Sequence, residues 1–243
     1  MDIEKSFSYP FEDTEVGSKL GLGAAIGLIP ILNFAWTGYM VDIIRNVMSD
    51  TPRPLPNWDD FGRKLVDGLI IIVAFLIYAL PIIILLCLPL TALVGSGILS
   101  ANSDMENIAR TLEGVSGILF ACIFGLSMLY MLGLSVIQPA IMVVFAREGT
   151  FASCFKLREA FNLISRNAGA FFTAWGVGLA LNFGVLLVVA FINIILSIIP
   201  CLGGLLGMGF SIVAYTYVVA VYAHLFGQFA REAFGQTQLV PVG

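Results

Sequence analysis

The sequence contains four runs without Asp, Glu, Lys or Arg, and these runs constrain the fold more than any other feature. They extend over residues 20–41, 68–103, 114–146 and 167–230. Each is at least as long as the roughly 20 apolar residues that an α-helix needs to cross a bilayer core, and the last is long enough for two crossings. Because 59% of the residues are hydrophobic and only 12% are charged, we predict an integral membrane protein.

The predicted fold class is all-α: a polytopic integral membrane helical bundle that forms a single membrane domain over residues 1–243. The acidic N-terminus is interrupted by Pro10 and lacks the basic, then apolar order of a cleaved signal peptide. We therefore expect an N-terminal polar segment (1–19), a broken membrane segment (20–41), four full spans (68–100, 114–146, 167–196 and 204–230) and a C-terminal tail (231–243).

The first membrane segment, residues 20–41, is interrupted by four glycines and Pro30. Proline removes a backbone hydrogen bond and breaks a helix interior. Two arrangements remain open. If the segment crosses, the chain has five spans and an outer N-terminus; if it enters and returns, the N-terminus is cytoplasmic. The second places eleven of the twelve basic residues inside, against nine for the first, and is favoured by the positive-inside rule.

Basic residues concentrate in two connecting segments, 42–67 and 147–166, each of which holds four Lys or Arg. Cytoplasmic loops carry an excess of these residues. We therefore place both segments in the cytoplasm and the protein in the cell inner membrane.

The segment TPRPLPNWDDFGRKL, residues 51–65, predicts an interfacial helix over 57–67. Its three prolines favour extended backbone, and Asn57 is a good N-cap. Trp58 is expected at headgroup level, with the charged side chains toward water; these interfacial residues are Trp58, Asp59, Asp60, Arg63 and Lys64. An alternative is that Asp59 and Asp60 bind a cation or a partner. A second amphipathic pattern predicts another interfacial helix over 150–166.

Three segments carry a family resemblance: SFSYPFED (6–13), LIPILNFAWTGYMVDIIRNV (28–47) and PLPNWDDFG (54–62). The chain resembles an uncharacterised family of bacterial and archaeal polytopic membrane proteins, domain of unknown function four thousand and thirteen. The resemblance implies an integral membrane protein with several helices, and it supplies no activity, substrate or catalytic residue.

Polar residues inside the apolar runs are candidate functional groups because they are costly in a bilayer. Asn182 and Asn193 share one helical face and either line a polar path or form interhelical hydrogen bonds. Gln138 and Asn33 lie near prolines and could bond the freed carbonyls. His224 is either a hydrogen-bonded interfacial histidine or part of a proton relay. The candidates are Asn33, Gln138, Asn182, Asn193 and His224.

Small residues at helical spacing predict close contacts between helices. One ridge comprises Gly117, Ala121 and Gly125, and another comprises Gly203 and Gly207. The spacing does not distinguish contacts within the chain from contacts between chains.

The remaining composition bears on function. The net charge of −4 argues against nucleic-acid binding. The four cysteines, Cys87, Cys122, Cys154 and Cys201, lack metal-site spacing, and we expect no cofactor, no metal site and no catalytic residue.

Three functions remain open. We favour a non-catalytic scaffold, assembly factor or accessory subunit, whose partners are the lipid bilayer and other membrane subunits or the chain itself. A transporter or channel for small solutes or lipid is the first alternative, because broken helices often build binding sites. An intramembrane enzyme is the least favoured, because no activated nucleophile, base pair or metal motif is found.

Overall fold

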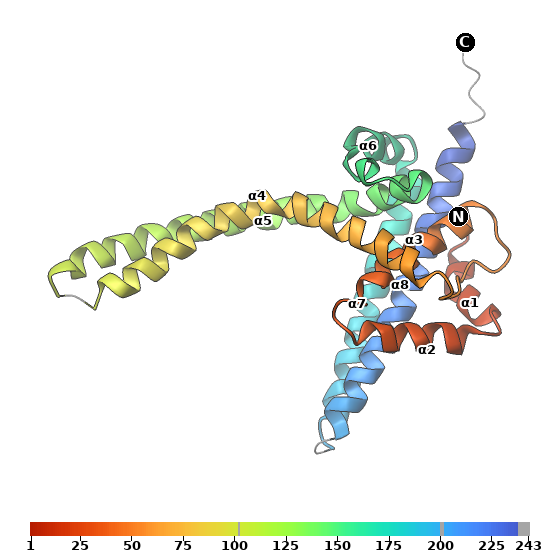
Figure 1. Ribbon diagram of the computed structural model, residues 1–243, viewed down its shortest axis with the longest axis horizontal. Helices are drawn as coiled ribbons and strands as arrows, with labels where there is room; N and C mark the ends of the chain where they lie inside the picture. Colours follow the sequence, from red (N-terminus) through yellow and green to blue (C-terminus); the bar gives the residue numbers. More distant parts are fainter. Residues whose placement is uncertain (102, 200–201, 238–243) are drawn as a thin grey trace, which may run out of the picture. The chain divides into compact units, whose positions relative to one another are not determined.

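The chain is α-helical throughout the part that the computed structural model describes, residues 1–101, 103–199 and 202–237 (Figure 1). No strand occurs in these ranges. Two short 3-10 helices, η1 (Ser103–Met105) and η2 (Phe151–Phe155), accompany the α-helices, which are α1 (Ile3–Glu12), α2 (Val16–Gly27), α3 (Phe34–Met48), α4 (Phe61–Leu99), α5 (Glu106–Glu148), α6 (Leu157–Arg166), α7 (Ala168–Leu196) and α8 (Leu202–Thr237). The predicted all-α class is confirmed.

Four of the described helices, α4, α5, α7 and α8, are long and apolar enough to cross a membrane. They cover the four predicted spans except for Ser100, after the end of α4, and Asn167, before the start of α7. Helices α4 and α5 begin before the predicted spans, because the sequence-based limits were set by charged residues, which do not end a helix by themselves. Helix α8 likewise continues into the predicted tail as far as Thr237; residues 238–243 of that tail lie outside the described ranges.

The first membrane segment is broken at Pro30. Helix α2 ends at Gly27, and α3 begins at Phe34. The two helices have 12 and 15 residues, so each is shorter than the roughly 20 residues of a full crossing. Both contact α8.

The chain divides into two compact units. Unit 1 comprises residues 1–72 and 139–243, and unit 2 comprises residues 73–138. Unit 2 is built from the second part of α4 and the first part of α5, where the Tyr130 hydroxyl donates a hydrogen bond to the Tyr78 carbonyl at 2.9 Å.

Helix α8 is the centre of unit 1. It contacts α1, α2, α3 and α7, and its residues Val218–Val221 are buried. The first part of α4 crosses α3 so closely that a methyl group at Gly38 would overlap the Lys64 carbonyl, and one at Gly68 would overlap the Phe34 carbonyl. The two helices meet backbone to backbone because both crossing positions are glycine.

Two polar segments differ from the expectation, and the N-terminal polar segment, for which no helix was specified, is helical. The N-terminal polar segment forms α1 and the start of α2, and α1 packs on α8. The expected interfacial helix over 57–67 is replaced by the start of α4 at Phe61, so Asn57 does not cap it. The expected helix over 150–166 is split into η2 and α6.

Candidate functional site

A cluster of charged side chains joins α3 to the start of α4 in unit 1. The Asp42 carboxylate accepts from Arg63 at 3.0 Å, contacts the Lys64 ammonium at 3.1 Å and accepts from Arg45 at 3.2 Å. Arg45 also donates to the Asp67 carboxylate at 2.6 Å and to the Ala146 carbonyl at 3.0 Å. Asp42, Lys64 and Asp67 are buried, and each has an oppositely charged partner, as buried charges require.

This cluster corrects the placement of two charged residues. Lys64 and Asp67 were expected on the wet side of a surface helix, but the structure buries them against α3. Asp59, Asp60 and Arg63 are exposed, and Arg63 reaches back to Asp42. The helical pattern of residues 57–67 alone did not reveal that α3 carries complementary charges.

Trp58 also lies inside unit 1. Its ring stacks on Tyr39 with centroids 4.7 Å apart and meets Trp36 edge to face at 5.5 Å. The indole N–H of Trp58 donates to the Lys19 carbonyl, and that of Trp36 donates to the Gly23 carbonyl, both at 2.8 Å. The Tyr39 hydroxyl is fully buried and has no hydrogen-bond partner among the described residues.

His224 is held in a polar network between α8 and α1. Its Nδ1 lies 2.9 Å from the Ser6 hydroxyl and 3.1 Å from the Gln228 side-chain nitrogen. The Tyr9 ring stacks on the imidazole with centroids 4.2 Å apart, and the Tyr9 hydroxyl donates to the Ala220 carbonyl at 3.0 Å. Burial raises the pKa of Tyr9 well above its ordinary value.

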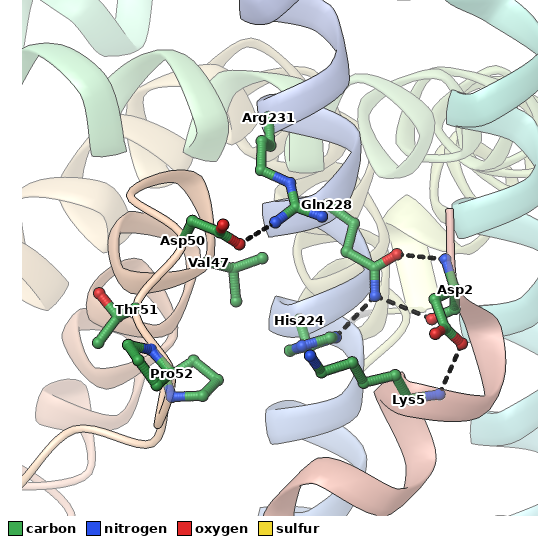
Figure 2. A pocket seen from close by; sticks show the side chains of 10 residues that line it. Asp2, Lys5, Val47, Asp50, Thr51, Pro52, His224, Gln228 and Arg231 are labelled. Atoms are coloured by element: carbon green, nitrogen blue, oxygen red, sulfur yellow. Dashed lines mark hydrogen bonds and ion pairs between the residues drawn. The ribbon is translucent and has the colours of Figure 1, made fainter.

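Gln228 completes this network by bonding the start of α1. Its side-chain oxygen accepts the Asp2 backbone N–H at 2.6 Å, and its side-chain nitrogen donates to the Asp2 carbonyl at 2.8 Å (Figure 2). The Asp2 carboxylate caps α1 by accepting the Lys5 backbone N–H at 2.9 Å. The network therefore fixes both the position of α1 and the orientation of the imidazole.

A pocket of about 170 Å³ opens beside His224 (Figure 2). Its wall on one side is the segment that follows α3, where Asp50 pairs with Arg231 of α8. Its lining combines acidic, basic and amide side chains with prolines: Asp2, Lys5, Val47, Asp50, Thr51, Pro52, Pro54, His224, Gln228 and Arg231. This pocket is the candidate site of unit 1.

The link between α1 and α2 carries a second fixed charge pair. The Lys19 ammonium lies 2.7 Å from the Asp13 carboxylate, which also accepts the Glu15 backbone N–H at 2.9 Å. Burial of Asp13 raises its pKa, but the bonds from Lys19 and Glu15 outweigh that effect, so the pKa of Asp13 is lowered. Lys19 also donates to the Leu55 carbonyl at 3.3 Å, which holds the segment before α4.

The other predicted polar residues lie apart from this pocket. Asn193 donates to Ser211 of α8 at 3.1 Å, which is an interhelical bond. Asn182 borders a mainly apolar groove of about 140 Å³ between α7 and α8. Gln138 and Asn33 are exposed, and no side-chain hydrogen bond of either is found within the described ranges.

The two small-residue ridges differ in their surroundings. A methyl group at Gly207 would overlap the Asn193 side chain, and one at Gly203 would overlap the Leu196 carbonyl. By contrast, a methyl group at Gly117 or Gly125 of α5 would meet no described atom within 4 Å. Ala121 between them is exposed.

The cysteines lie apart from one another in the described part of the chain. Cys87 and Cys122 are exposed and Cys154 is buried, and Cys201 lies outside the described residues. Burial raises the pKa of Cys154 to about 11, so its reactive thiolate is scarce near neutral pH. No group of three His, Cys, Asp or Glu side chains placed to hold a metal is found in the described ranges.

Sequence reasoning identified His224 but missed Ser6, Tyr9 and Gln228. Gln228 lies four residues after His224, one helical turn away, and this spacing could have indicated it. Ser6 and Tyr9 are more than 200 residues from His224, so no local pattern joins them.

Comparison with known proteins supplies a family and no further relative. No curated protein and no solved structure matches the chain. One family model, described as protein of unknown function (DUF4013), matches residues 22–194, which is more than half of the 243 residues. The match includes PLPNWDDFG and excludes SFSYPFED. The chain therefore belongs to the DUF4013 family of proteins of unknown function.

Proposed function

We propose that this membrane protein is a non-catalytic scaffold or accessory subunit that binds other membrane helices. The observation that carries the proposal is the open ridge of Gly117, Ala121 and Gly125 on α5. Association of helices in a membrane relies on close packing at small residues. In unit 1 the glycines of α7 differ from one another: Gly178 lies against Tyr222, where an added methyl group would come within 2.6 Å of the ring, whereas Gly176 and Gly184 are open.

The polar groups of unit 1 support a structural rather than a catalytic role. Asp42 and Asp67 each form an ion pair with Arg45. The buried His224 Nδ1 is used by Ser6 and Gln228. Catalysis needs an activated nucleophile or base aimed at a substrate, whereas these contacts hold helices together. We propose a helix of another subunit, or of a second copy, as the occupant of the ridge.

The ridge is tested by co-purification. Gly125→Leu fills it with a side chain and is expected to release the partner or dissociate the oligomer when native membranes are extracted with mild detergent. The matched control is Gly133→Leu, at a glycine of α5 that also has no described atom within 4 Å of an added methyl group and lies about 120° from the centre of the ridge.

Wild type that is recovered only as an isolated monomer would overturn the proposal. Equal loss of the partner in both variants would also overturn it, because the ridge would then have no special role.

We also propose that the protein lies in the cell inner membrane with segments 42–67 and 147–166 in the cytoplasm. The basic residues of these segments support this orientation. Arg53 and Lys156 are exposed and lie outside the four candidate spans.

Orientation is tested with single cysteines in a background whose native cysteines are replaced by alanine. Arg53→Cys and Lys156→Cys are expected to react with a membrane-impermeant maleimide only after the cells are opened. Asn107→Cys, between the first two predicted spans, is expected to react in intact cells. Labelling of position 53 or 156 from outside would refute the orientation.

A further inference from the structure

We propose that the pocket beside His224 binds a phosphate group, either that of a phospholipid headgroup or a free phosphate. The inference concerns unit 1 alone and goes beyond the scaffold role, which rests on α5. It is carried by three donors that line one pocket and come from two helices: His224, Lys5 and Arg231.

The hydrogen bonds of Gln228 identify the free nitrogen of His224. The Gln228 oxygen accepts from the Asp2 backbone N–H, so its nitrogen is the atom that faces the imidazole. An amide nitrogen only donates. Nδ1 of His224 is therefore the acceptor, and the proton of the neutral ring is on Nε2.

Nε2 of His224 has no hydrogen-bond partner among the described residues. His224 is only 3% exposed. Among the described residues, the Tyr39 hydroxyl is the only fully buried polar side-chain atom without a hydrogen-bond partner. Nε2 of His224 also has no partner among them, so it must be partly exposed. Since His224 lines the pocket, this N–H is a donor accessible from it. A ligand acceptor that enters the pocket could therefore accept a hydrogen bond from this N–H.

Lys5 supplies a positive charge to the same pocket. Its side chain extends from α1 toward His224 (Figure 2), and no ion pair of its ammonium occurs in the described part of the chain. Arg231 is the second cation. Its partner Asp50 has an 81% exposed side chain, so the pair is solvated and contributes little stability. Arg231 is therefore free to exchange Asp50 for a ligand oxygen at small cost.

Two carboxylates also line the pocket, and both are already engaged. Asp2 caps α1 through the Lys5 backbone N–H, and Asp50 binds Arg231. The four charged residues of the lining balance formally, so recognition depends on directed donors rather than on net charge. One imidazole N–H, one ammonium and one guanidinium match the oxygens of a phosphate.

The size of the pocket limits the ligand. A volume of about 170 Å³ is below the roughly 300–1,000 Å³ of pockets that enclose a whole drug-sized molecule. It suits a single charged group whose remainder lies outside.

The test uses the full chain and measures its thermal unfolding midpoint, because a ligand that binds the native state raises that midpoint. One arm titrates inorganic phosphate at constant ionic strength, with chloride as the reference salt. A second arm compares phosphatidylcholine nanodiscs with and without phosphatidic acid. Native mass spectrometry of the released protein then reports retained phospholipid.

Lys5→Gln is the main variant because this side chain is exposed and has no ion pair to lose among the described residues. We expect it to weaken the phosphate-bearing ligand by about tenfold or more, as the loss of one charged hydrogen bond implies. Arg231→Gln should weaken it similarly. Arg158→Gln is the matched control, since it removes an exposed cation on α6, outside the pocket.

The two arms distinguish the source of the phosphate. Stabilisation by phosphatidic acid together with one retained phospholipid, both lost in Lys5→Gln, identifies a headgroup. Stabilisation by inorganic phosphate without retained lipid identifies a free phosphate. The proposal is overturned if neither ligand stabilises wild type, or if Lys5→Gln responds as fully as Arg158→Gln. None of these outcomes depends on the ridge of α5.

Discussion

Tyr39 and Tyr9 are both buried tyrosines, but within the described ranges only Tyr9 has a partner for its hydroxyl. Burial of a polar group without a hydrogen bond is unfavourable. We expect Tyr39→Phe to leave the free energy of unfolding unchanged or to raise it, because the ring contacts with Trp36 and Trp58 remain. The matched Tyr9→Phe should lower it by about 0.5–1.5 kcal/mol. Urea unfolding in detergent, followed by tryptophan fluorescence, measures the free energy of unfolding of both variants. A larger decrease in Tyr39→Phe than in Tyr9→Phe would contradict the absence of a hydrogen bond at the Tyr39 hydroxyl.

For single residues, the sequence identified candidate functional residues more reliably than it predicted their contacts in the fold. His224 was identified as a candidate because a histidine in an apolar run is rare. Its surroundings depend on Ser6 and Tyr9, which follow Met1 by only a few residues and reach α8 through the fold. Trp58 was expected at the headgroups because its neighbours in sequence are charged, whereas Trp36 and Tyr39 cover it in the structure.

The crossing of α3 and α4 depends on two glycines. Gly38 and Gly68 each face a backbone carbonyl of the other helix, and a methyl group at either position would overlap it. Backbone atoms yield less readily than the end of a flexible side chain, so Gly38→Ala and Gly68→Ala should each destabilise unit 1 by about 1–3 kcal/mol or more, as overpacking does.

The control for this crossing is Gly62→Ala, near the start of α4, where nothing lies within 4 Å of an added methyl group. Alanine is the better helix former by about 1 kcal/mol, so this variant should be neutral or stabilising. Thermal unfolding in one detergent compares all three. Equal midpoints would mean that the helices separate at no cost.

The long apolar helices were predictable from the length of the apolar runs. The limits of the shorter, more polar helices were less predictable, because they depend on packing. The last three charge-free runs located the cores of α4, α5, α7 and α8, because a span of that length has no alternative in a bilayer. The helix start was misplaced at Asn57, since a good N-cap residue does not begin a helix when its chain is held by other contacts. In this chain the Leu55 carbonyl is bound by Lys19.

Over the whole molecule, the arginines illustrate two kinds of charged residue. Arg45 is joined to Asp42, Asp67 and the Ala146 carbonyl, and so links α3, α4 and the end of α5 within unit 1. Arg110 pairs with Glu106 on the same helix, and its side chain is 74% exposed. Hydropathy identified the protein as a membrane protein. It assigns the same value to every arginine, so it could not distinguish the cluster-forming Arg45 from the exposed Arg110.

Removal of the two guanidinium groups should therefore have unequal effects. Arg45→Met leaves buried carboxylates with fewer partners and should cost about 3–5 kcal/mol. Arg110→Met should cost less than about 0.5 kcal/mol, as exposed helix pairs do. Urea titrations at low and high salt compare the two, and the Arg45 effect should persist at high salt because burial limits screening. A small, salt-sensitive effect at Arg45 would contradict the burial of this cluster.

The contact between α1 and α8 has a consequence for biosynthesis. Helix α1 finds its partner in α8, which is translated more than 200 residues later. At roughly 5–20 residues per second, α1 waits on the order of 10–40 s before His224 emerges. During that interval the face of α1 that later packs on α8 is available to chaperones or to neighbouring chains. The docking of α1 on α8 is therefore a late step of assembly, and it completes the lining of the His224 pocket.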